Sequence, residues 1–345
     1  MGRKLLWASL ALTPVVLLVR YALGVEGTVT FVLAAAALAP LAFLIGEATE
    51  NVAEHTGSGV GGFLNASFGN APELIIALFA VGSGLPNVVR GSIAGSVVST
   101  SLLVLGASMI AGGEGELDRR SLLLQVGTVL LAVALFLVPS VAGWHGDPDR
   151  HSLYVLTVPV AAVLLVVYAL VTFHNLRIHA AAERREASED AWPLKVGLAA
   201  LAAATVATAL VSEVLVKSLD AFGHALGLSQ FFVAAVIVAL VGNAAEQGGA
   251  IVIAHRGNTR LGAEIAISSA TQVAVFVAPA IALLSPLVGQ ALPLSFRPVE
   301  IGAMAAGALV VTVTVLDGRS RRSEGFVLVA LYALIVVAFF FSGDR

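Results

Sequence analysis

Long apolar stretches alternate with short polar connections along almost the whole chain. A helix needs roughly 20 apolar residues to cross a bilayer, and eleven stretches approach that length. They cover residues 5–23, 27–46, 60–83, 91–112, 121–142, 152–174, 194–216, 230–254, 262–285, 298–316 and 324–342. No ten-residue alternation of the kind found in membrane β-barrels is present. The pattern therefore predicts an all-α polytopic membrane protein with about eleven transmembrane helices.

The composition supports a membrane protein. Of 345 residues, 58% are hydrophobic and only 12% are charged, whereas soluble domains carry about 25% charged residues. A net charge of −3 without a basic tail excludes an electrostatic footprint for nucleic acid. The chain has no cysteine, which excludes disulfides, thiolate ligands and cysteine nucleophiles. The first apolar stretch follows Arg3 and Lys4 and lacks a clear cleavage site, so we interpret it as a retained span.

The distribution of Lys and Arg predicts the orientation. With the N-terminus inside, thirteen of these residues lie in inner segments: Arg3, Lys4, Arg119, Arg120, Arg177, Arg184, Arg185, Lys195, Arg256, Arg260, Arg319, Arg321 and Arg322. Six lie in outer segments: Arg20, Arg90, Arg150, Lys217, Arg297 and Arg345. Because positive charge favours the cytosolic side, we expect a cytosolic N-terminus and an external C-terminus.

Setting the first span aside leaves two halves of five spans each. We divide the chain into an N-terminal span (1–24), a first five-helix repeat (25–176), a cytosolic acidic linker helix (177–192) and a second five-helix repeat (193–345). An odd number of spans per half places the second repeat upside down relative to the first. Inverted repeats are typical of secondary transporters, whose substrate site lies at the midplane between the halves.

One motif occurs in both halves, inside apolar surroundings. It reads Gly69-Asn70-Ala71-Pro72-Glu73 in the first half and Gly242-Asn243-Ala244-Ala245-Glu246 in the second. A shift of 173 residues superimposes the two copies, and it also places Ser96 on Ser269 and Ser99 on Gln272. An acid at this depth in a membrane is energetically costly and indicates function. A single such acid could be a structural, hydrogen-bonded group, but the duplication favours one site built from two halves.

The doubled motif suits a hard cation. Two carboxylates and two amides supply oxygen ligands, and calcium binds six to eight of them. Pro72 lacks an N–H and is expected to leave the carbonyl of Phe68 free, while Gly69 and Gly242 allow the helices to loosen there. We therefore expect Glu73 and Glu246 to ligate the metal, with Asn70 and Asn243 shaping the site.

The same carboxylates account for proton coupling. Burial and mutual repulsion favour protonation of the empty site, whereas cation binding requires the charged form. Competition between protons and a cation for one site, exposed alternately to the two sides of the membrane, is sufficient for antiport.

At these residues the chain resembles the calcium/proton exchanger family of the calcium/cation antiporter superfamily. The resemblance is carried by GSGVGGFLNASFGNAPELIIALFAV from Gly57 to Val81, VGNAAEQGGAI from Val241 to Ile251 and ISSATQVAVFVAPAIAL from Ile267 to Leu283. It implies that Glu73 and Glu246 exchange cations and protons and that Ser99 and Gln272 line the pathway, as we expect also for Ser96 and Ser269. Pro72, Gln247 and Thr100 depart from the family pattern, which leaves the selectivity among calcium, manganese and sodium open.

Further acids lie near the mouths of the expected pathway and in the linker. Glu47 and Glu213 fall at opposite ends of equivalent helices, where they either relay cations and protons or are simply solvated. The linker carries Glu183, Glu186, Glu189 and Asp190. By the resemblance these acids would form a regulatory calcium-sensing helix, and the alternative is a solvated linker of mixed charge.

The sequence therefore predicts a calcium/proton antiporter without a cofactor, whose partners are calcium, protons and the lipid bilayer. A sodium-driven or manganese-preferring exchanger is the alternative, and a cation channel or a membrane-embedded metalloenzyme fits less well because no HExxH, GxSxG or DxD pattern is present. The excess of Arg over Lys hints at a bacterial gene and a plasma-membrane location, with an acidic organelle as the alternative. The oligomeric state stays open, and a homo-oligomer is compatible with the sequence.

Overall fold

The computed structural model describes residues 7–180 and 192–344, and these residues are almost entirely helical. Helices of the first half are α2 (Leu12–Leu17), η1 (Leu18–Ala22), α3 (Thr28–Phe68), α4 (Ala71–Gly82), α5 (Pro86–Val98), η2 (Ser99–Val104), α6 (Leu105–Gly112), α7 (Arg119–Gly143) and α8 (His151–Ala180). Those of the second half are α9 (Leu194–Leu226), α10 (Gln230–Phe232), η3 (Val233–Val238), α11 (Ala239–Gly242), α12 (Ala244–His255), α13 (Thr259–Gln272), η4 (Val273–Val277), α14 (Ala278–Val288), α15 (Pro298–Val315) and α16 (Arg322–Ser342). The segments labelled η are π-helical turns.

The predicted all-α polytopic architecture is confirmed. Within residues 7–180 and 192–344, eight helices are long and apolar enough to span a membrane, and a bent pair over Gln230–His255 makes a ninth. Two shorter apolar helices cover Trp7–Ala22 and Ala71–Gly82. Every predicted apolar stretch overlaps one of these segments, so the structure is compatible with eleven spans.

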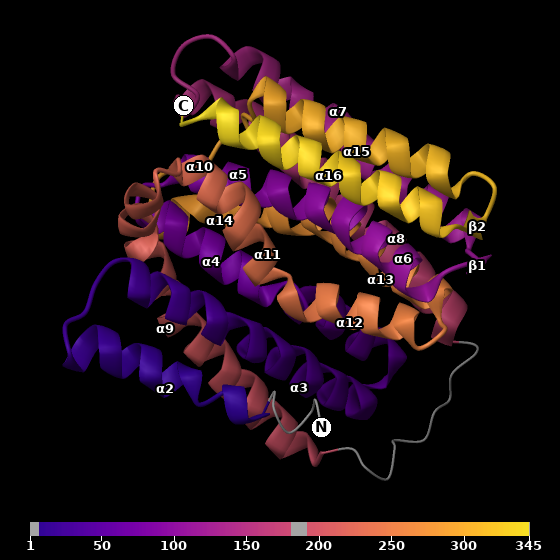
Figure 1. Cartoon of the computed structure of the whole chain (residues 1–345), viewed down its shortest axis with the longest axis horizontal. Coiled ribbons are helices and arrows are strands. Elements are labelled where there is room, and N and C mark those ends of the chain that lie inside the picture. The colour runs from indigo at the N-terminus through magenta and orange to yellow at the C-terminus, as the bar shows by residue number, and fades with distance from the viewer. Residues whose placement is uncertain (1–6, 181–191, 345) are drawn as a thin grey trace.

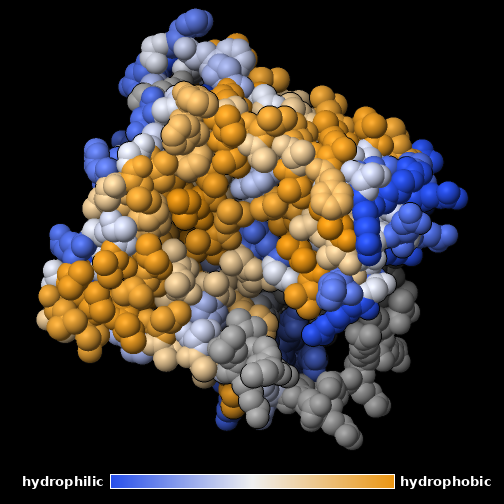
Figure 2. All heavy atoms as spheres, in the orientation of Figure 1, coloured by the Kyte–Doolittle hydropathy of each residue, from blue (hydrophilic) through white to orange (hydrophobic). Residues whose placement is uncertain are grey.

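The surface has the polarity expected of a membrane protein. In the view of Figure 2, apolar residues form a broad band across the middle, and polar residues gather toward the two ends of the long axis. One of these ends carries β1 (Gly115–Glu116) and β2 (Arg319–Ser320), which pair antiparallel and join the α6–α7 and α15–α16 connections. The strands lie outside the spans, so they do not alter the helical membrane architecture.

The helices are arranged in two outer groups with the broken helices between them (Figure 1). Helices α3 and α9 pack along each other and α2 packs on α3 at one side of the bundle, and α15 and α16 lie at the other. Between these groups lie α4, α5, α11, α12 and α13, which carry both copies of the motif and the helices that follow them. The candidate site is therefore in the interior of the bundle.

Several boundaries differ from the sequence prediction. The predicted interruption between residues 46 and 60 is wrong, because α3 continues without a break from Thr28 to Phe68. Helix α9 continues to Leu226, where Gly227 ends it with a left-handed backbone conformation (φ 68°). The predicted end at residue 216 was too early because Lys217 interrupts the apolar run, although it pairs with Glu213 on the same helix. The acidic linker residues Glu183, Glu186, Glu189 and Asp190 lie outside the described residues, and α8 extends to Ala180 before them.

The connection between α14 and α15 is an extended segment that runs through the interior. Leu292, Leu294 and Phe296 on this segment are fully buried. Buried backbone groups need hydrogen-bond partners, and here hydroxyl groups from other helices supply them: Ser285 Oγ accepts from Leu292 N (2.8 Å), Thr157 Oγ1 from Leu294 N (3.0 Å) and Ser140 Oγ from Phe296 N (2.9 Å). The segment thereby joins three helices at the end of the bundle opposite to β1 and β2.

Candidate cation and proton site

Both copies of the motif lie at breaks between consecutive helices. The first break falls between α3 and α4 and the second between α11 and α12, whose axes differ by 60°. Asn70 and Asn243 occupy the breaks with nearly equal backbone angles, φ −96° and ψ 12° against φ −93° and ψ 8°. Helices α4 and α12 each have 12 residues, and their first residues, Ala71 and Ala244, are separated by the 173 residues of the predicted register. This equality supports the predicted repeat.

Pro72 has a different role from the one predicted. It belongs to the first turn of α4, not to the interior of a longer helix. The first N–H groups of a helix have no intrahelical partner, so proline is well tolerated there. Pro72 therefore begins the second helix, and the interruption itself lies at Gly69 and Asn70.

The two motif amides reach across the molecule and do not cap their own helices. Asn243 Nδ2 donates to Ser96 Oγ at 2.9 Å and to the carbonyl of Ala239 at 3.0 Å, and Ser269 Oγ donates to Asn243 Oδ1 at 3.4 Å. Asn70 Nδ2 donates to Gln272 Oε1 at 2.5 Å. Each amide therefore joins its break to the helix that follows the motif in the other half.

Glu73 lies in the first turn of α4 against the second copy of the motif. A Cβ built on Gly242 would lie 3.3 Å from Glu73 Oε1. Glu73 lines a cavity of about 20 Å³ among α4, α5, the η3–α11 run, η4 and α14, together with Ser92, Ser96 and mostly apolar side chains. That volume holds about one water-sized particle. The other carboxylate oxygen, Oε2, is buried without a hydrogen bond to any described residue.

Glu246 lies in the first turn of α12 and faces a different space. It lines a cavity of about 1600 Å³, which we call the inner cavity, together with Gly69, Gly242, Ser269 and Gln272. The walls also include Asp118 and Arg260 from the end of the bundle that carries β1 and β2. The Arg260 side chain is 59% exposed, so the inner cavity is continuous with solvent at this end. Glu246 therefore lines a cavity that opens toward the predicted cytosolic side, and Glu73 lines the smaller cavity.

The structure places eleven of the predicted residues in or beside the two cavities. Ser96 and Ser269 bond Asn243, and Ser99 Oγ lies 3.5 Å from Gln247 Nε2. Glu47 lines the inner cavity as expected for an acid at its mouth. The remaining predicted residues of this group are Glu73, Glu246, Asn70, Gly69, Gly242 and Gln272. Glu213 lies outside both cavities and forms a 2.5 Å ion pair with Lys217.

Several inner-cavity residues were not found from the sequence. Glu50, Asn51 and Glu54 follow Glu47 on α3, and Glu264 faces them from α13. The spacing of Glu47, Glu50 and Glu54 is i, i+3 and i+7, which places them on one helix face, and this signal could have identified them. Asp118 and Arg260 form a 2.5 Å ion pair at the rim, which no local sequence pattern indicates.

Within the described part of the chain, no three His, Asp or Glu side chains come together as a metal site. A cation between Glu73 and Glu246 would therefore complete its coordination with amide, hydroxyl and backbone oxygens or with water. Calcium tolerates such mixed oxygen ligands. The arrangement can accept a hard cation or protons, and it offers no residue set for covalent catalysis.

Known cation exchangers are similar to this chain over most of its length. The sodium/calcium exchanger protein family matches residues 26–177 and 196–341. A Ca²⁺/H⁺ antiporter from Aphanothece halophytica is 35% identical over 90% of this chain and 90% of its own length. The Ca²⁺/H⁺ antiporter ChaA of Bacillus subtilis is 34% identical over 87% of this chain and 88% of its own. The solved structure of native YfkE is similar with a TM-score of 0.83 and 31% identity, and the match covers 97% of this chain and 99% of that one.

Proposed function

Because the chain belongs to the sodium/calcium exchanger protein family, we propose that it is a calcium/proton antiporter in which Glu73 and Glu246 form the shared cation and proton site. The relatives that match over nearly their full length are Ca²⁺/H⁺ antiporters, which are transporters and not enzymes. Calcium is accordingly the substrate and not a cofactor. The many apolar helices make the protein a multi-pass membrane protein.

One observation carries the assignment of the site. Each glutamate lies in the first turn of the second helix of a broken pair, and Glu73 approaches the other copy of the motif, with its Oε1 3.3 Å from where a Cβ on Gly242 would lie. An interior acid of this kind requires a counter-charge or a proton. Calcium and protons would satisfy the same carboxylates in alternation.

The two cavities support alternating access. The inner cavity reaches Glu246 and Gln272, whereas Glu73 lines the smaller cavity. We infer that this is the inward-open state, in which calcium from the predicted cytosolic side replaces protons on the carboxylates. Movement of one group of helices against the other would then expose the loaded site to the opposite side.

The test is calcium flux in proteoliposomes with an imposed pH gradient. Glu73→Gln and Glu246→Gln are expected to abolish flux driven by the proton gradient. Glu26→Gln is the matched control, because the Glu26 side chain is 73% exposed and pairs with Arg20 at the surface. Flux that persists in either site variant would place the site elsewhere. Flux that follows a sodium gradient, or prefers manganese, would favour the alternative exchangers.

We propose that Glu47 and Glu213 attract cations and relay protons at the two mouths of the pathway. Glu47 lines the inner cavity and could pass cations or protons toward Glu246. Glu213 is paired with Lys217, so its charge is partly neutralised at the predicted outer side. Transport in Glu47→Gln and Glu213→Gln, measured across a range of pH, tests both roles: an unchanged pH profile would contradict a relay.

A further inference from the structure

The 173-residue register of the motif extends to the helices that follow it. Helix α5 begins at Pro86 and α13 begins at Thr259, which are again 173 residues apart. Each of them continues into a π-helical turn, η2 from Ser99 and η4 from Val273. Residues around the site in one half can therefore be paired by number with residues in the other half.

The cavity of about 20 Å³ beside Glu73, which we call the small cavity, pairs in this way with the inner cavity. Six of its lining residues come from α4, α5 and the second motif: Glu73, Ile76, Ala77, Ser92, Ser96 and Gly242. The residue 173 positions away from each of these six lines the inner cavity. The two cavities are therefore equivalent spaces of the two halves, although their volumes are about 20 and 1600 Å³.

The small cavity extends from Glu73 toward the end of the bundle opposite to β1 and β2, which we call the outer end. Helix α4 runs from the motif to Gly82, where an added Cβ would lie 3.2 Å from the carbonyl oxygen of Val288. Val288 ends α14, directly before the extended segment at the outer end. The lining residues on α4 begin at Glu73 and continue with Ile76 and Ala77, about one helical turn closer to this end.

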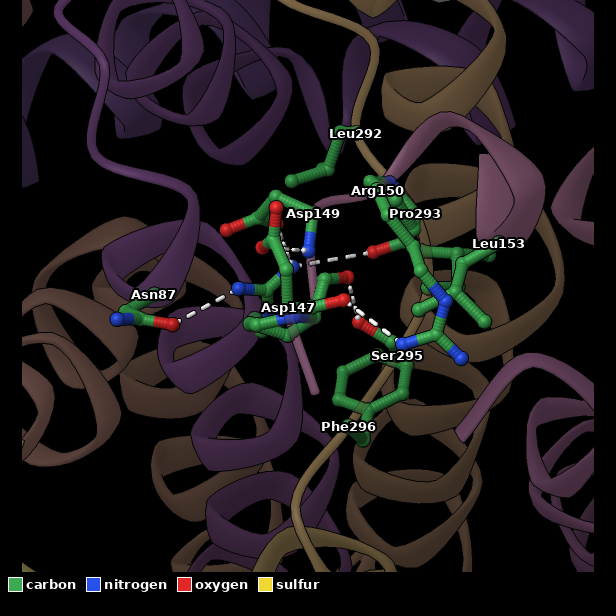
Figure 3. Close-up of polar contacts among 12 residues, drawn as sticks. Asn87, Asp147, Asp149, Arg150, Leu153, Leu292, Pro293, Ser295 and Phe296 are labelled. Carbon is green, nitrogen blue, oxygen red and sulfur yellow. Dashed lines mark hydrogen bonds and ion pairs between the residues drawn. The ribbon is translucent and has the colours of Figure 1, made fainter. Parts of the chain in front are cut away.

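The start of α5 gives the same direction. Arg90 of α5 is 1% exposed, and its guanidinium donates to Asp149 Oδ1 at 2.7 Å and to the carbonyl of Pro293 at 3.3 Å. Figure 3 shows Asp149 and Pro293 here, where the α7–α8 connection meets the extended segment before α15. Because α5 starts at the outer end, Ser92 lies about one turn closer to that end than Ser96.

An isoleucine stands in the small cavity where the inner cavity has a glycine. Ile76 is 3% exposed, whereas a Cβ built on its counterpart, Gly249, would meet no atom within 4 Å. The side chain of Ile76 thus occupies space that is empty at the equivalent position of the inner cavity. Ile93 of α5 and Ile281 of α14 also line the small cavity and are buried. These branched side chains leave room for about one water molecule.

Ser92 adds a polar group to the small cavity on the outer side of Ser96. Its hydroxyl donates to the carbonyl of Val89 at 3.0 Å. A hydroxyl that donates in this way keeps lone pairs that can face a cation or a water molecule. The register of the motif does not single out Ser92, because its counterpart is the apolar residue Ile265.

We propose that the small cavity is the outer vestibule of the pathway in its closed form, filled by Ile76, and that ions reach Glu73 past Ser92 when Ile76 withdraws. This inference rests on the proposed alternating access. The inner cavity represents the open form of the equivalent space in the other half. Ile76 and Ser92 thereby have roles in access to the site, separate from ion binding by Glu73 and Glu246.

The absence of cysteine from the sequence permits a test with single thiols in the full-length protein. Ser92→Cys places a thiol in the small cavity, and Ile265→Cys places one at the equivalent position of the inner cavity. Ser101→Cys is the control, because Ser101 is 4% exposed and lines neither cavity. A membrane-impermeant thiol reagent is added to intact cells or to inverted membrane vesicles, and the labelling rate is measured from each side.

Ser92→Cys and Ile265→Cys are expected to react from opposite sides of the membrane, and Ser101→Cys from neither. Because Ile265→Cys defines the inner side, this result does not depend on the predicted orientation. Ala77→Cys, on the α4 wall of the small cavity, provides the same test if Ser92→Cys does not fold.

Truncation of Ile76 tests the side chain that fills the vestibule. Removing a buried isoleucine side chain destabilises the state in which it is packed, so Ile76→Ala should accelerate outer-side labelling of Ser92→Cys by about tenfold. It should also slow inner-side labelling of Ile265→Cys, as a shift between two states requires. Ile335→Ala is the matched control, since Ile335 of α16 is 8% exposed and lines neither cavity. It should change both rates by less than about twofold.

Ile76→Val makes a smaller change in the same direction and provides the test if Ile76→Ala does not fold. Labelling of Ser92→Cys from the same side as Ile265→Cys, or from neither side, would overturn the outer vestibule. Equal labelling rates in the Ile76→Ala and Ile335→Ala backgrounds would overturn the role of Ile76. If flux is lost in Glu73→Gln while either of these results is found, the antiporter is retained and its outer pathway lies elsewhere. Flux that persists in Glu73→Gln would contradict the proposed site, whatever the labelling.

Discussion

Asn70 and Gln272 are separated by 202 residues in sequence, and the side-chain amide of Asn70 donates to the side-chain carbonyl of Gln272 at 2.5 Å. The nitrogen of Gln272 in turn donates to Ser268 Oγ at 3.2 Å. This chain of hydrogen bonds fixes the oxygen and nitrogen ends of both amides. It connects the break of the first half to the helix that forms one wall of the inner cavity, so the site depends on both halves at once.

Removal of the Gln272 amide is expected to weaken calcium binding. Gln272→Ala leaves the buried amide of Asn70 without this partner, at a cost of about 1–3 kcal/mol, which corresponds to roughly a tenfold or larger loss of affinity. Equilibrium binding of radioactive calcium to the purified protein measures it. Thr128→Ala is the control, since that hydroxyl also lines the inner cavity but bonds only the carbonyl of Leu124 on its own helix. Equal affinity in the two variants would contradict a role for Gln272.

A side chain at Gly242 is expected to displace the Glu73 carboxylate and to weaken calcium binding. In Gly242→Ala the new methyl group would lie 3.3 Å from both Cγ and Oε1 of Glu73, so the carboxylate has to move by a few tenths of an ångström. Displaced ligands lose affinity, and we expect a loss of about tenfold, or 1.4 kcal/mol. Gly248→Ala on the next helix, α12, is the control, because its methyl group would meet no atom within 4 Å. Calorimetric calcium titration of both variants measures the difference, and equal affinities would show that Glu73 tolerates the methyl group.

The positions of the spans and of the doubled motif could be predicted from the sequence because both depend on local patterns. A run of about 20 apolar residues is sufficient to define a membrane helix, and an acid within such a run is conspicuous. The 173-residue register of the motif was also predicted, and it matches the first residues of α4 and α12, Ala71 and Ala244, although the helix breaks before them were expected only as local loosening at the glycines. The pairing of Asn243 with Ser96 was not predicted, although both residues had been placed in the site.

The structural features that could not be predicted depend on contacts between segments that are distant in the sequence. The extended segment before α15 is held by the hydroxyls of Ser140 and Thr157, which no pattern near residues 289–297 indicates. The close contact between the Phe231 ring and Gly91 likewise joins residues from different halves. Glu73 and Glu246 line different cavities, and no local pattern in the sequence indicates that separation.

The ion pair between Arg90 and Asp149, at the end of the bundle opposite to β1 and β2, is expected to stabilise the fold. In Asp149→Asn the fully buried guanidinium of Arg90 loses its carboxylate partner, and breaking a buried pair by removing one partner destabilises by about 3–5 kcal/mol. Because the Asp149 side chain is 25% exposed, water can replace part of the interaction and we expect the lower end of that range, about 3 kcal/mol.

Thermal unfolding in detergent measures this effect. Asp317→Asn is the control, because Asp317 pairs with Arg321 at the surface, where both side chains are more than 40% exposed. Its effect should be no more than about 1 kcal/mol. If Asp149→Asn melts at the same temperature as the native protein, the Arg90–Asp149 pair does not stabilise the fold.

The ion pair at the rim of the inner cavity predicts a pH-dependent contribution to stability. Asp118 precedes α7, and the backbone N–H of Ser121 and the guanidinium of Arg260 lower the pKa of its carboxyl. A carboxyl with a lowered folded-state pKa stabilises the protein above its unfolded pKa of about 3.9, and this contribution disappears as the pH falls through the folded-state value. Asp118→Asn keeps a helix-capping side chain but not the charge, so it should melt below the native protein at pH 7 and converge with it below about pH 4. Melting curves of both proteins from pH 7 to about pH 3 test this, and a constant difference across the range would show that the charge of Asp118 is not responsible.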